Sequence, residues 1–384
     1  MAGALLVSSQ LRPGSPIAAS FHFDESTIET GAAPASVAIA DVNHDGKPDI
    51  LVANTLSETL SVLLGDGRGH FNAAPGAACT TGHAPNDIAL GDFNNDGNID
   101  VVIANTEIPN LTILLGDGKG GFRPSPHSPF VTTSHPHVHG VAAADFNSDG
   151  KLDVVTDSWG NNQIILLLGD GAGNLLLPGQ RFNTGIRPYQ RVRSADFNKD
   201  GKADVVTTDL DQDTVSILLG DGKGGLHDAP GSPFAAGARP WAVAVDDMNR
   251  DGNADLVILP YEPDVRDPRD VGVTVLLGDG KGGFTKMRGS PLSLAGCRGP
   301  DRVATGDING DGLRDIAVIC AQNNKLMLYA GSKEGTFAVS TRDVPTGWSA
   351  VAVGDLNGDG KDDVVVSNNT SGGKTGALTI LLTK

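Results

Sequence analysis

Seven copies of one nine-residue pattern of oxygen-bearing side chains, Asp-x-Asn-x-Asp-Gly-x-x-Asp, occur in this chain of 384 residues. We call these segments the aspartate loops, and they start at Asp41, Asp92, Asp145, Asp196, Asp247, Asp307 and Asp355. A hard cation needs several oxygen ligands at about 2.4 Å, and alternate residues of a tight loop can direct their oxygens to one centre. The pattern therefore predicts seven cation sites.

Within each loop we expect positions 1, 3, 5 and 9 to supply side-chain oxygens and position 7 to supply a backbone carbonyl, while the glycine permits the sharp turn. Ca²⁺ is favoured over Mg²⁺ because several carboxylates and a carbonyl suit a larger, less rigid shell. Asx turns without metal are the structural alternative, but turn chemistry does not require an acid at position 9. The expected ligands of about seven structural calcium ions are Asp41, Asn43, Asp45, Asp49, Asp92, Asn94, Asp96, Asp100, Asp145, Asn147, Asp149, Asp153, Asp196, Asn198, Asp200, Asp204, Asp247, Asn249, Asp251, Asp255, Asp307, Asn309, Asp311, Asp315, Asp355, Asn357, Asp359 and Asp363.

The loops recur at intervals of 51, 53, 51, 51, 60 and 48 residues, a period typical of repeat architectures. In the second unit the loop lies between short apolar runs at 86–90 and 101–104, which we expect to pair as antiparallel strands. A third run at 111–115 leads through a glycine-rich hairpin into a fourth strand that opens at Phe122. Four antiparallel strands repeated seven times predict an all-β, seven-bladed β-propeller.

The last unit has three strands, and its fourth strand is expected from the other end of the sequence. Phe21-His22-Phe23 followed by a Gly-x-x-Pro at 31–34 repeats the layout of Phe71 followed by 82–85. Closure by this segment would pair the two open edges of the ring. An open solenoid is the alternative, but no capping unit is visible. We read residues 1–20 as an N-terminal extension and residues 21–384 as one propeller domain.

The formal charge of −17 is explained by the loops, which hold 21 of the 46 acidic residues. Seven bound divalent cations would bring the charge to −3, so neither a nucleic-acid footprint nor a polyanionic surface remains. No apolar stretch approaches the roughly 18 residues of a membrane span. Residues 1–7 lack the basic segment and apolar length of a signal peptide, so the chain is cytoplasmic as written or a mature form behind a new Met. We expect an extracellular or periplasmic monomer.

Three cysteines do not form a disulfide framework. Cys297 precedes the sixth blade and Cys320 ends that blade's second strand, so both are expected at the same end of the blade. A bridge between them and two buried thiols both remain open, because the outcome depends on the redox compartment. Cys79 has no expected partner.

The aspartate loops, the Gly-x-x-Pro entries at 31–34 and 82–85 and the Phe after each glycine hairpin resemble the FG-GAP or VCBS repeat, known from the integrin α-subunit propeller. The resemblance covers residues 21–384 and implies a calcium-stabilised propeller. Most integrin α propellers carry such loops in only some blades. Seven intact loops in one chain are more similar to the fungal lectins built as seven-bladed calcium propellers.

The two rims of the expected ring differ. The aspartate loops and glycine hairpins share one rim, and the opposite rim, which we call the variable rim, differs from blade to blade. Variable loops on a uniform scaffold are typical of binding and catalytic sites. We expect ligand contacts there from His137, His139, Trp159, Tyr189, Arg191, Arg193, Trp241, Asp301, Arg302 and Trp348.

Arg193 stands where the other six blades have Ala on the inner strand, so it needs either a ligand or an ion pair, for example with an Asp of an adjacent blade. The entry 134–139 holds three His at alternate positions, which span about 13 Å in an extended chain and suit a zinc site poorly.

Three functions remain open. The first is binding of a glycan or small anionic ligand at the channel mouth on the variable rim. The second is a lyase or isomerase acting on a uronate-like substrate, by analogy with propeller polysaccharide lyases, with His139, Tyr189 and Arg193 as catalytic residues. The third is a protein-interaction platform.

Overall fold

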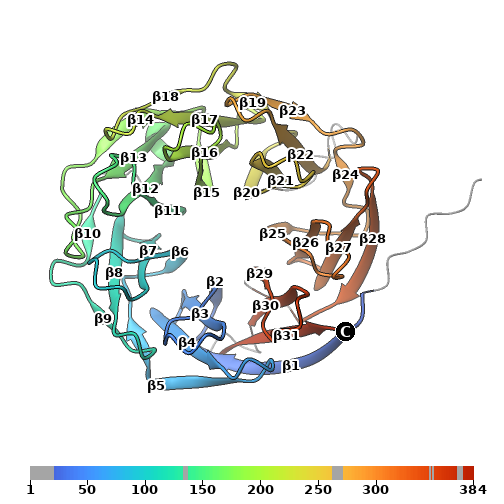
Figure 1. The fold of residues 1–384 in the computed structure, drawn as a ribbon, viewed down its shortest axis with the longest axis horizontal. Helices are drawn as coiled ribbons and strands as arrows, with labels where there is room; N and C mark the ends of the chain where they lie inside the picture. Colours follow the sequence, from blue (N-terminus) through green and yellow to red (C-terminus); the bar gives the residue numbers. More distant parts are fainter. Residues whose placement is uncertain (1–20, 133–136, 262–270, 346, 348–349, 370–374) are drawn as a thin grey trace, which may run out of the picture.

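The computed structural model describes residues 21–132, 137–261, 271–345, 347, 350–369 and 375–384. Within them, antiparallel sheets are arranged around a central channel as a seven-bladed β-propeller (Figure 1). The first strand of each blade lies nearest the channel, and the last lies at the outside. This confirms the predicted fold class.

Each blade follows the same strand order from the channel outwards, with the outermost strand split in two in blades 2, 4 and 5. Blade 1 contains β2 (Pro34–Ala40), β3 (Asp49–Asn54), β4 (Thr59–Gly65) and β5 (Phe71–Thr80). Blade 2 contains β6 (Pro85–Gly91), β7 (Asp100–Asn105), β8 (Asn110–Gly116), β9 (Phe122–Pro124) and β10 (Phe130–Val131). Blade 3 contains β11 (Val141–Ala144), β12 (Asp153–Ser158), the 3-10 helix η1 (Trp159–Asn161), β13 (Gln163–Leu167) and β14 (Gln180–Asn183).

The remaining blades repeat this layout. Blade 4 contains β15 (Pro188–Ala195), β16 (Asp204–Asp209), β17 (Thr214–Gly220), β18 (Leu226–Asp228) and β19 (Phe234–Ala235). Blade 5 contains β20 (Pro240–Asp246), β21 (Asp255–Pro260), β22 (Gly272–Gly278), β23 (Phe284–Lys286) and β24 (Leu292–Ser293). Blade 6 contains β25 (Pro300–Gly306), β26 (Asp315–Cys320), β27 (Lys325–Gly331) and β28 (Phe337–Asp343). Blade 7 contains β29 (Val351–Gly354), β30 (Asp363–Asn369), β31 (Gly376–Thr383) and β1 (Phe23–Thr30).

The ring is closed by β1, which pairs antiparallel with β31 from Phe23 opposite Thr383 to Thr30 opposite Gly376. The N-terminal segment therefore supplies the outermost strand of blade 7, as the sequence predicts. This pairing joins the first and last described segments and removes two open strand edges.

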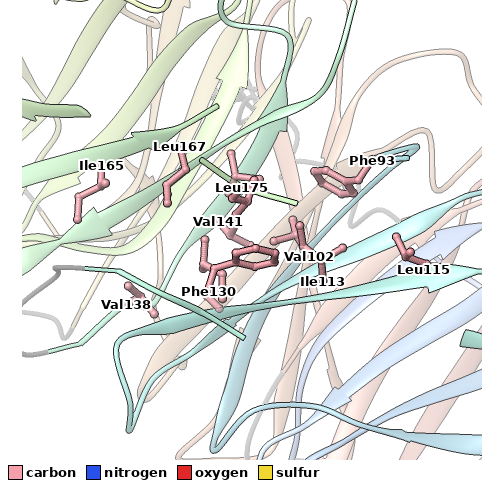
Figure 2. Packing of buried hydrophobic residues seen from close by; sticks show 13 residues of the cluster. Phe93, Val102, Ile113, Leu115, Phe130, Val138, Val141, Ile165, Leu167 and Leu175 are labelled. Carbon is pink, nitrogen blue, oxygen red and sulfur yellow. The ribbon is translucent and has the colours of Figure 1, made fainter. Parts of the chain in front are cut away.

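The hydrophobic core is divided among the junctions between blades. The second strand is the most deeply buried strand in blades 1 to 6, and in β7, for example, every residue is buried. Between blades 2 and 3, side chains from both sheets interlock, among them Val102, Ile113, Phe130 and Leu167 (Figure 2). Each blade thus buries both faces against its neighbours, which matches the short β-branched runs of the sequence.

The aspartate loops and glycine hairpins share one rim, as expected. In blades 3, 4 and 5 the hairpin glycine donates its N–H to a loop carbonyl of the preceding blade: Gly173 to Phe93, Gly224 to Phe146 and Gly282 to Phe197, at 2.9–3.1 Å. These bonds fasten consecutive blades together at that rim. None of the described segments forms a helix long and apolar enough to cross a membrane.

Candidate functional site

Each aspartate loop is anchored by its ninth residue, which begins the second strand of the blade and is fully buried. In blade 3 the Asp153 carboxylate accepts N–H bonds from Phe146 at 3.0 Å and from Gly169 at 2.8 Å. Blades 1, 2, 4 and 5 repeat both contacts. The position-9 acid thus joins loop and hairpin, which explains its invariance within the chain in addition to any metal.

The other loop oxygens converge on one turn of backbone. In blade 3, Asp145 Oδ1 and Asn147 Oδ1 both accept the N–H of Asp149, at 3.1 and 3.0 Å, so the two oxygens lie side by side. Gly150 adopts a φ of 81°, the left-handed region that favours glycine, and donates to Asp145 Oδ2. Each carboxylate oxygen has two lone pairs, so these contacts leave acceptor capacity.

The electrostatics of the loops suit a cation. Burial, together with the neighbouring carboxylates of Asp96 and Asp92, raises the pKa of Asp100 to about 6, although N–H bonds from Gly116 and Phe93 oppose the shift. The same causes raise the pKa of Asp153 to about 6 and that of Asp315 to about 7. Several carboxylates therefore lie close together in each loop, and their mutual repulsion is unfavourable. A bound divalent cation would relieve that repulsion.

The loop of blade 6 differs from the others. Asp307 Oδ1 is buried and has no hydrogen-bond partner among the described residues. A buried carboxylate oxygen without a hydrogen-bond partner is suited to bind a cation in the loop. Across the described residues, however, no three His, Cys, Asp or Glu side chains are already arranged to hold a metal. The donor set fits Ca²⁺, and the other oxygens of this loop, on Asn309, Asp311 and Asp315, accept hydrogen bonds from backbone N–H groups.

Three arginines and one carboxylate meet in the central channel, in what we call the arginine cavity. Its volume is about 60 Å³, and Asp87, Arg191, Arg193 and Arg302 line it with Ser36 and small apolar residues. Arg191 of blade 4 forms an ion pair with Asp87 of blade 2, and Arg193 Nη1 lies 3.1 Å from Asp87 Oδ2. The ion pair that the sequence left open for Arg193 is present, with a partner two blades away rather than on the adjacent blade.

Positive charge exceeds negative charge in this cavity. Burial alone would raise the pKa of Asp87, but Arg191 and Arg193 outweigh it and hold that pKa below its ordinary value. Burial and, after it, the charge of Arg302 lower the pKa of Arg191 to about 9, although Asp87 opposes both. Arg302 is buried as well, and its Nε has no hydrogen-bond partner within the described residues. The cavity thus holds cationic groups that lack a full complement of acceptors.

An aromatic pocket of about 130 Å³ lies on the variable rim between blades 5 and 6. The rings of Trp241 and Tyr261 lie 4.3 Å apart between centroids, and the Arg239 guanidinium lies 4.7 Å from the Tyr261 ring centre. Asp301 Oδ1 accepts bonds from Trp241 Nε1 at 3.0 Å and from Arg302 Nη1 at 2.6 Å. One carboxylate therefore connects the aromatic pocket to the arginine cavity.

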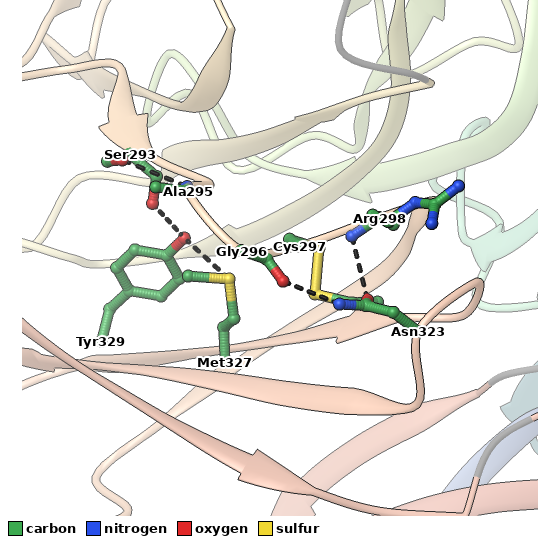
Figure 3. The surroundings of a disulfide bond; sticks show 9 residues. Ser293, Ala295, Gly296, Cys297, Arg298, Asn323, Met327 and Tyr329 are labelled. Carbon is green, nitrogen blue, oxygen red and sulfur yellow. Dashed lines mark hydrogen bonds between the residues drawn. A yellow bond between two sulfur atoms is a disulfide. The ribbon is translucent and has the colours of Figure 1, made fainter.

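The wall of this pocket is fixed by a disulfide between Cys297 and Cys320, whose Cα atoms lie 5.2 Å apart (Figure 3). Residues within a few positions after the two cysteines, including Pro300 and Gln322, line the pocket. Asn323 reinforces the same wall, because its side chain donates to Gly296 O at 2.8 Å and accepts from Arg298 N at 3.0 Å. The bridge that the sequence left open is present, and Cys79 is a free thiol.

His137 and His139 are close together but do not line the arginine cavity. Their ring centroids lie 5.8 Å apart, and His137 Nδ1 lies 2.8 Å from Thr106 O. His139 is buried, and its Nδ1 lies 3.1 Å from Asp157 Oδ2. Asp157 also accepts the N–H bonds of His139 and Gly140 at 2.7 Å. Asp157 therefore holds the ring and the backbone of His139 in place, which favours a structural role for this residue.

Several predicted residues lie outside this description. Trp348 and the stretches 133–136 and 262–270 fall outside the described residues, as does the N-terminal extension 1–20. Tyr189 lies in β15 and Trp159 in η1, and their side chains are likewise outside the description. Asp87, which lines the arginine cavity, is not among the site residues expected from the sequence. The sequence does contain a signal for its role: when the blades are aligned, Asp87 occupies the position that Arg191 and Arg302 occupy in blades 4 and 6.

A family model described as "FG-GAP-like repeat" matches residues 41–103, 92–156, 196–258 and 307–366, which together make up more than half of the chain. The chain belongs to the FG-GAP-like repeat family. The matched ranges together contain all seven aspartate loops and the strands beside them. The resemblance inferred from the sequence is thereby confirmed.

Relatives with this repeat include the mouse protein "Cartilage acidic protein 1", which is 26% identical over 246 residues. The alignment covers 60% of this FG-GAP chain and 37% of the mouse protein. The counterpart from Xenopus tropicalis is 28% identical over 182 residues, 44% of this chain and 28% of that protein. The chain thus spans about a third of the length of these relatives.

Solved structures share the fold at low sequence identity. A lectin from Agrocybe aegerita, described as recognising non-reducing terminal N-acetylglucosamine, has a TM-score of 0.52 and 16% identity, with 94% of this chain and 86% of the lectin covered. Virginiamycin B lyase from Staphylococcus aureus has a TM-score of 0.57 and 10% identity, with 94% and 100% covered. At these identities the likeness concerns the fold alone.

Proposed function

We propose that this FG-GAP propeller is stabilised by calcium and binds an acidic saccharide or another small anionic ligand at the channel mouth on the variable rim. The observation that carries the proposal is the convergence of Arg191, Arg193 and Arg302 on one cavity in which Asp87 is the lining carboxylate. Burying more positive than negative charge is costly, and an incoming anion would offset that cost.

The size of the arginine cavity limits what can enter it. One water needs roughly 10–15 Å³ of this kind of volume. A cavity of about 60 Å³ suits a carboxylate or another small acidic group and excludes a whole sugar ring. A ligand would therefore insert its acidic group and leave its remaining atoms on the rim.

The aromatic pocket is the natural place for those remaining atoms. Trp241 offers a large flat apolar surface, and Asp301 and Gln322 offer hydrogen-bonding groups beside it. A uronate fits this pair of subsites, with its carboxylate on the arginines and its ring against Trp241. Asp301 would couple the two subsites because it holds both Trp241 and Arg302.

Binding is favoured over catalysis because the described lining of the arginine cavity contains no histidine or tyrosine, and Tyr261 of the aromatic pocket packs against Trp241 and Arg239. Asp87 is held as a carboxylate by two arginines, which suits a counter-ion rather than a general acid. The disulfide supports an oxidising compartment, so we propose an extracellular or periplasmic location.

The calcium ions would act on stability. They would be held by loop oxygens on the rim opposite the ligand and would offset the crowding of carboxylates there. The side chains that would hold them in blade 3 are Asp145, Asn147, Asp149 and Asp153. Calcium should therefore raise the melting temperature without entering the ligand site.

The test compares binding of glucuronate and glucose by isothermal titration calorimetry, with a glycan array and an absorbance assay for unsaturated uronates in parallel. We expect glucuronate to bind and glucose to bind much more weakly. Arg193→Ala should weaken glucuronate binding by roughly tenfold, because one charge-assisted contact is lost. Its melting temperature should stay near that of the parent, because the side chain is 33% exposed and Arg191 still pairs with Asp87.

Arg187→Ala is the matched control. Arg187 belongs to the same blade and pairs with Asp211 at 3.2 Å on the protein surface, away from the arginine cavity. Its loss should leave glucuronate binding unchanged. If Arg193→Ala lowers stability strongly while binding is intact, Arg193 is a structural ion pair and the proposed anion site is wrong. Accumulation of unsaturated uronate would instead favour a lyase.

A further inference from the structure

The junction between blades 5 and 6 has a groove on the loop rim and outer side that is unrelated to the channel. Two cavities of about 330 and 410 Å³ adjoin there, and Gly335 and Phe337 line both. We call them together the blade 5–6 groove. The floor of the first cavity is apolar and consists of Met248, Leu277, Met287, Leu313 and Phe337.

The groove occurs where blade 6 departs from the repeat. Ser332, Lys333 and Glu334 stand where blade 5 has Asp279, Gly280 and Lys281. In blade 5 the Asp279 carboxylate caps the hairpin by accepting N–H bonds from Lys281 and Gly283. In blade 6, Gly335 N donates to Ser332 O within its own hairpin, whereas its counterpart Gly282 donates to the preceding blade. The altered hairpin leaves Met248 facing a cavity.

Every charged side chain that lines the groove is cationic. Arg250, Arg314 and Lys333 line the first cavity and Arg288 the second, and no Asp or Glu lines either. Arg314 is neutralised by Asp246 at 3.1 Å and Asp362 at 3.8 Å. Arg250, Lys333 and Arg288 have no ion pair within the described residues. A cationic lining in a chain of formal charge −17 is a local exception.

Arg250 lies at the end of the groove nearest the aspartate loops. Its guanidinium crosses from the loop of blade 5 to that of blade 6, since a Cβ built at Gly312 would lie 3.4 Å from its Nη1. Beyond Phe337 the second cavity continues past Leu292 to Val339, an apolar residue that is 39% exposed on the outer strand. Two of the three cations that lack an ion pair within the described residues, Arg250 and Lys333, lie together in the first cavity, and Arg288 lines the second, which is otherwise mostly apolar. A ligand with an acidic head group and an apolar chain matches this distribution.

We propose that the blade 5–6 groove is a second binding site, which takes a small amphipathic anion with one acidic head group and an unbranched apolar chain. The head group pairs with Arg250 and Lys333, and the chain lies on the methionine and leucine floor across Phe337. The volumes lie within the range of small-molecule sites, which are mostly apolar with a few placed polar groups. Methionines adapt well to a flexible chain.

The probe is decane-1-sulfonate below its micelle concentration, titrated into the full chain with calcium present. It should bind, whereas methanesulfonate lacks the chain and decyltrimethylammonium carries the wrong charge, so both should bind at least about tenfold more weakly. Lys333→Glu reverses an exposed charge and should weaken decane-1-sulfonate at least about tenfold. Val339→Asp should weaken it through the second cavity.

Lys223→Glu is the matched control, because Lys223 is an exposed lysine of the blade 4 hairpin on the same rim. It should change the affinity by less than about twofold. The proposal is overturned if Lys223→Glu weakens binding as much as Lys333→Glu, or if the cationic amphiphile binds as tightly as the sulfonate. It is also overturned if the folded parent shows no binding at about 1 mM.

Discussion

Asp87 on β6 and Arg191 on β15 form an ion pair that joins blade 2 to blade 4 across the central channel. Both side chains are buried, with 2% and 4% of their surfaces exposed. Gly140 occupies the corresponding position of blade 3 and has no side chain to separate them. Asp87 also accepts the N–H of Val141 in blade 3 at 3.3 Å, so its carboxylate ties together three blades at the point where the arginine cavity forms.

Asp87→Asn should be strongly destabilising. It removes the carboxylate that faces Arg191 and Arg193 while leaving the Arg191 guanidinium buried, a change that typically costs about 3–5 kcal/mol. Urea unfolding followed by circular dichroism would measure it. Sulfate should raise the melting temperature of the variant more than that of the parent, because an anion can replace the lost counter-ion.

Asp211→Asn is the control for this experiment. Asp211 pairs with Arg187 near the surface, where ion pairs contribute about 0–1 kcal/mol. The free energy of unfolding should therefore change little. If Asp87→Asn and Asp211→Asn lower the free energy of unfolding equally, the Asp87–Arg191 pair contributes no more to stability than a surface ion pair, and the prediction is wrong.

The fold and the loops could be predicted from the sequence because a nine-residue pattern with a regular period fixes both strand pairing and turn position. The N-terminal closure by β1 followed from the same repeat. The roles of Asp87 and Arg193 could not be predicted in full, because their pairing crosses blades 2 and 4 and depends on the curvature of the ring. Composition could not decide the Cys297–Cys320 bridge, since its spacing also fits two thiols.

The disulfide should contribute measurably to stability. It closes a separation of 23 residues, and the chain-entropy model gives about 3 kcal/mol for a loop of this size. The double variant Cys297→Ser with Cys320→Ser should lose that amount in urea unfolding under non-reducing conditions. Cys79→Ser removes the free thiol and should change stability little. Three reactive thiols in the unreduced, denatured parent would show that the bridge is absent.

Calcium removal should destabilise the propeller without abolishing its ligand site. Each of the seven loops has the same set of oxygen donors, so titration of metal-free protein should approach seven equivalents of Ca²⁺. Chelation should lower the melting temperature, since a ligand that binds only the folded state stabilises it. Asp204→Ala should cost stability and spare glucuronate binding at saturating calcium. Two or fewer equivalents of bound metal would refute the assignment.

Asp209 should make stability depend on pH near neutrality. It ends β16 at the position of Asn54 in β3 and Asn105 in β7, and it accepts hydroxyl bonds from Thr214 at 2.9 Å and Ser216 at 2.8 Å. Burial raises the pKa of its carboxyl to about 7, although these hydrogen bonds oppose the shift. The folded state then binds a proton that the unfolded chain releases near pH 4.

The sign of the effect follows from this difference in proton binding. The stability that protonated Asp209 contributes is fully present below about pH 4 and is lost as the pH rises through about 7. Asp209→Asn introduces the side chain that blades 1 and 2 have at this position, and that side chain does not ionise. Relative to the parent, its free energy of unfolding should rise across this interval by up to about 4 kcal/mol. Urea unfolding of both proteins between pH 4 and 8, in constant calcium, measures the difference directly, and parallel curves would show that Asp209 ionises normally in the folded state.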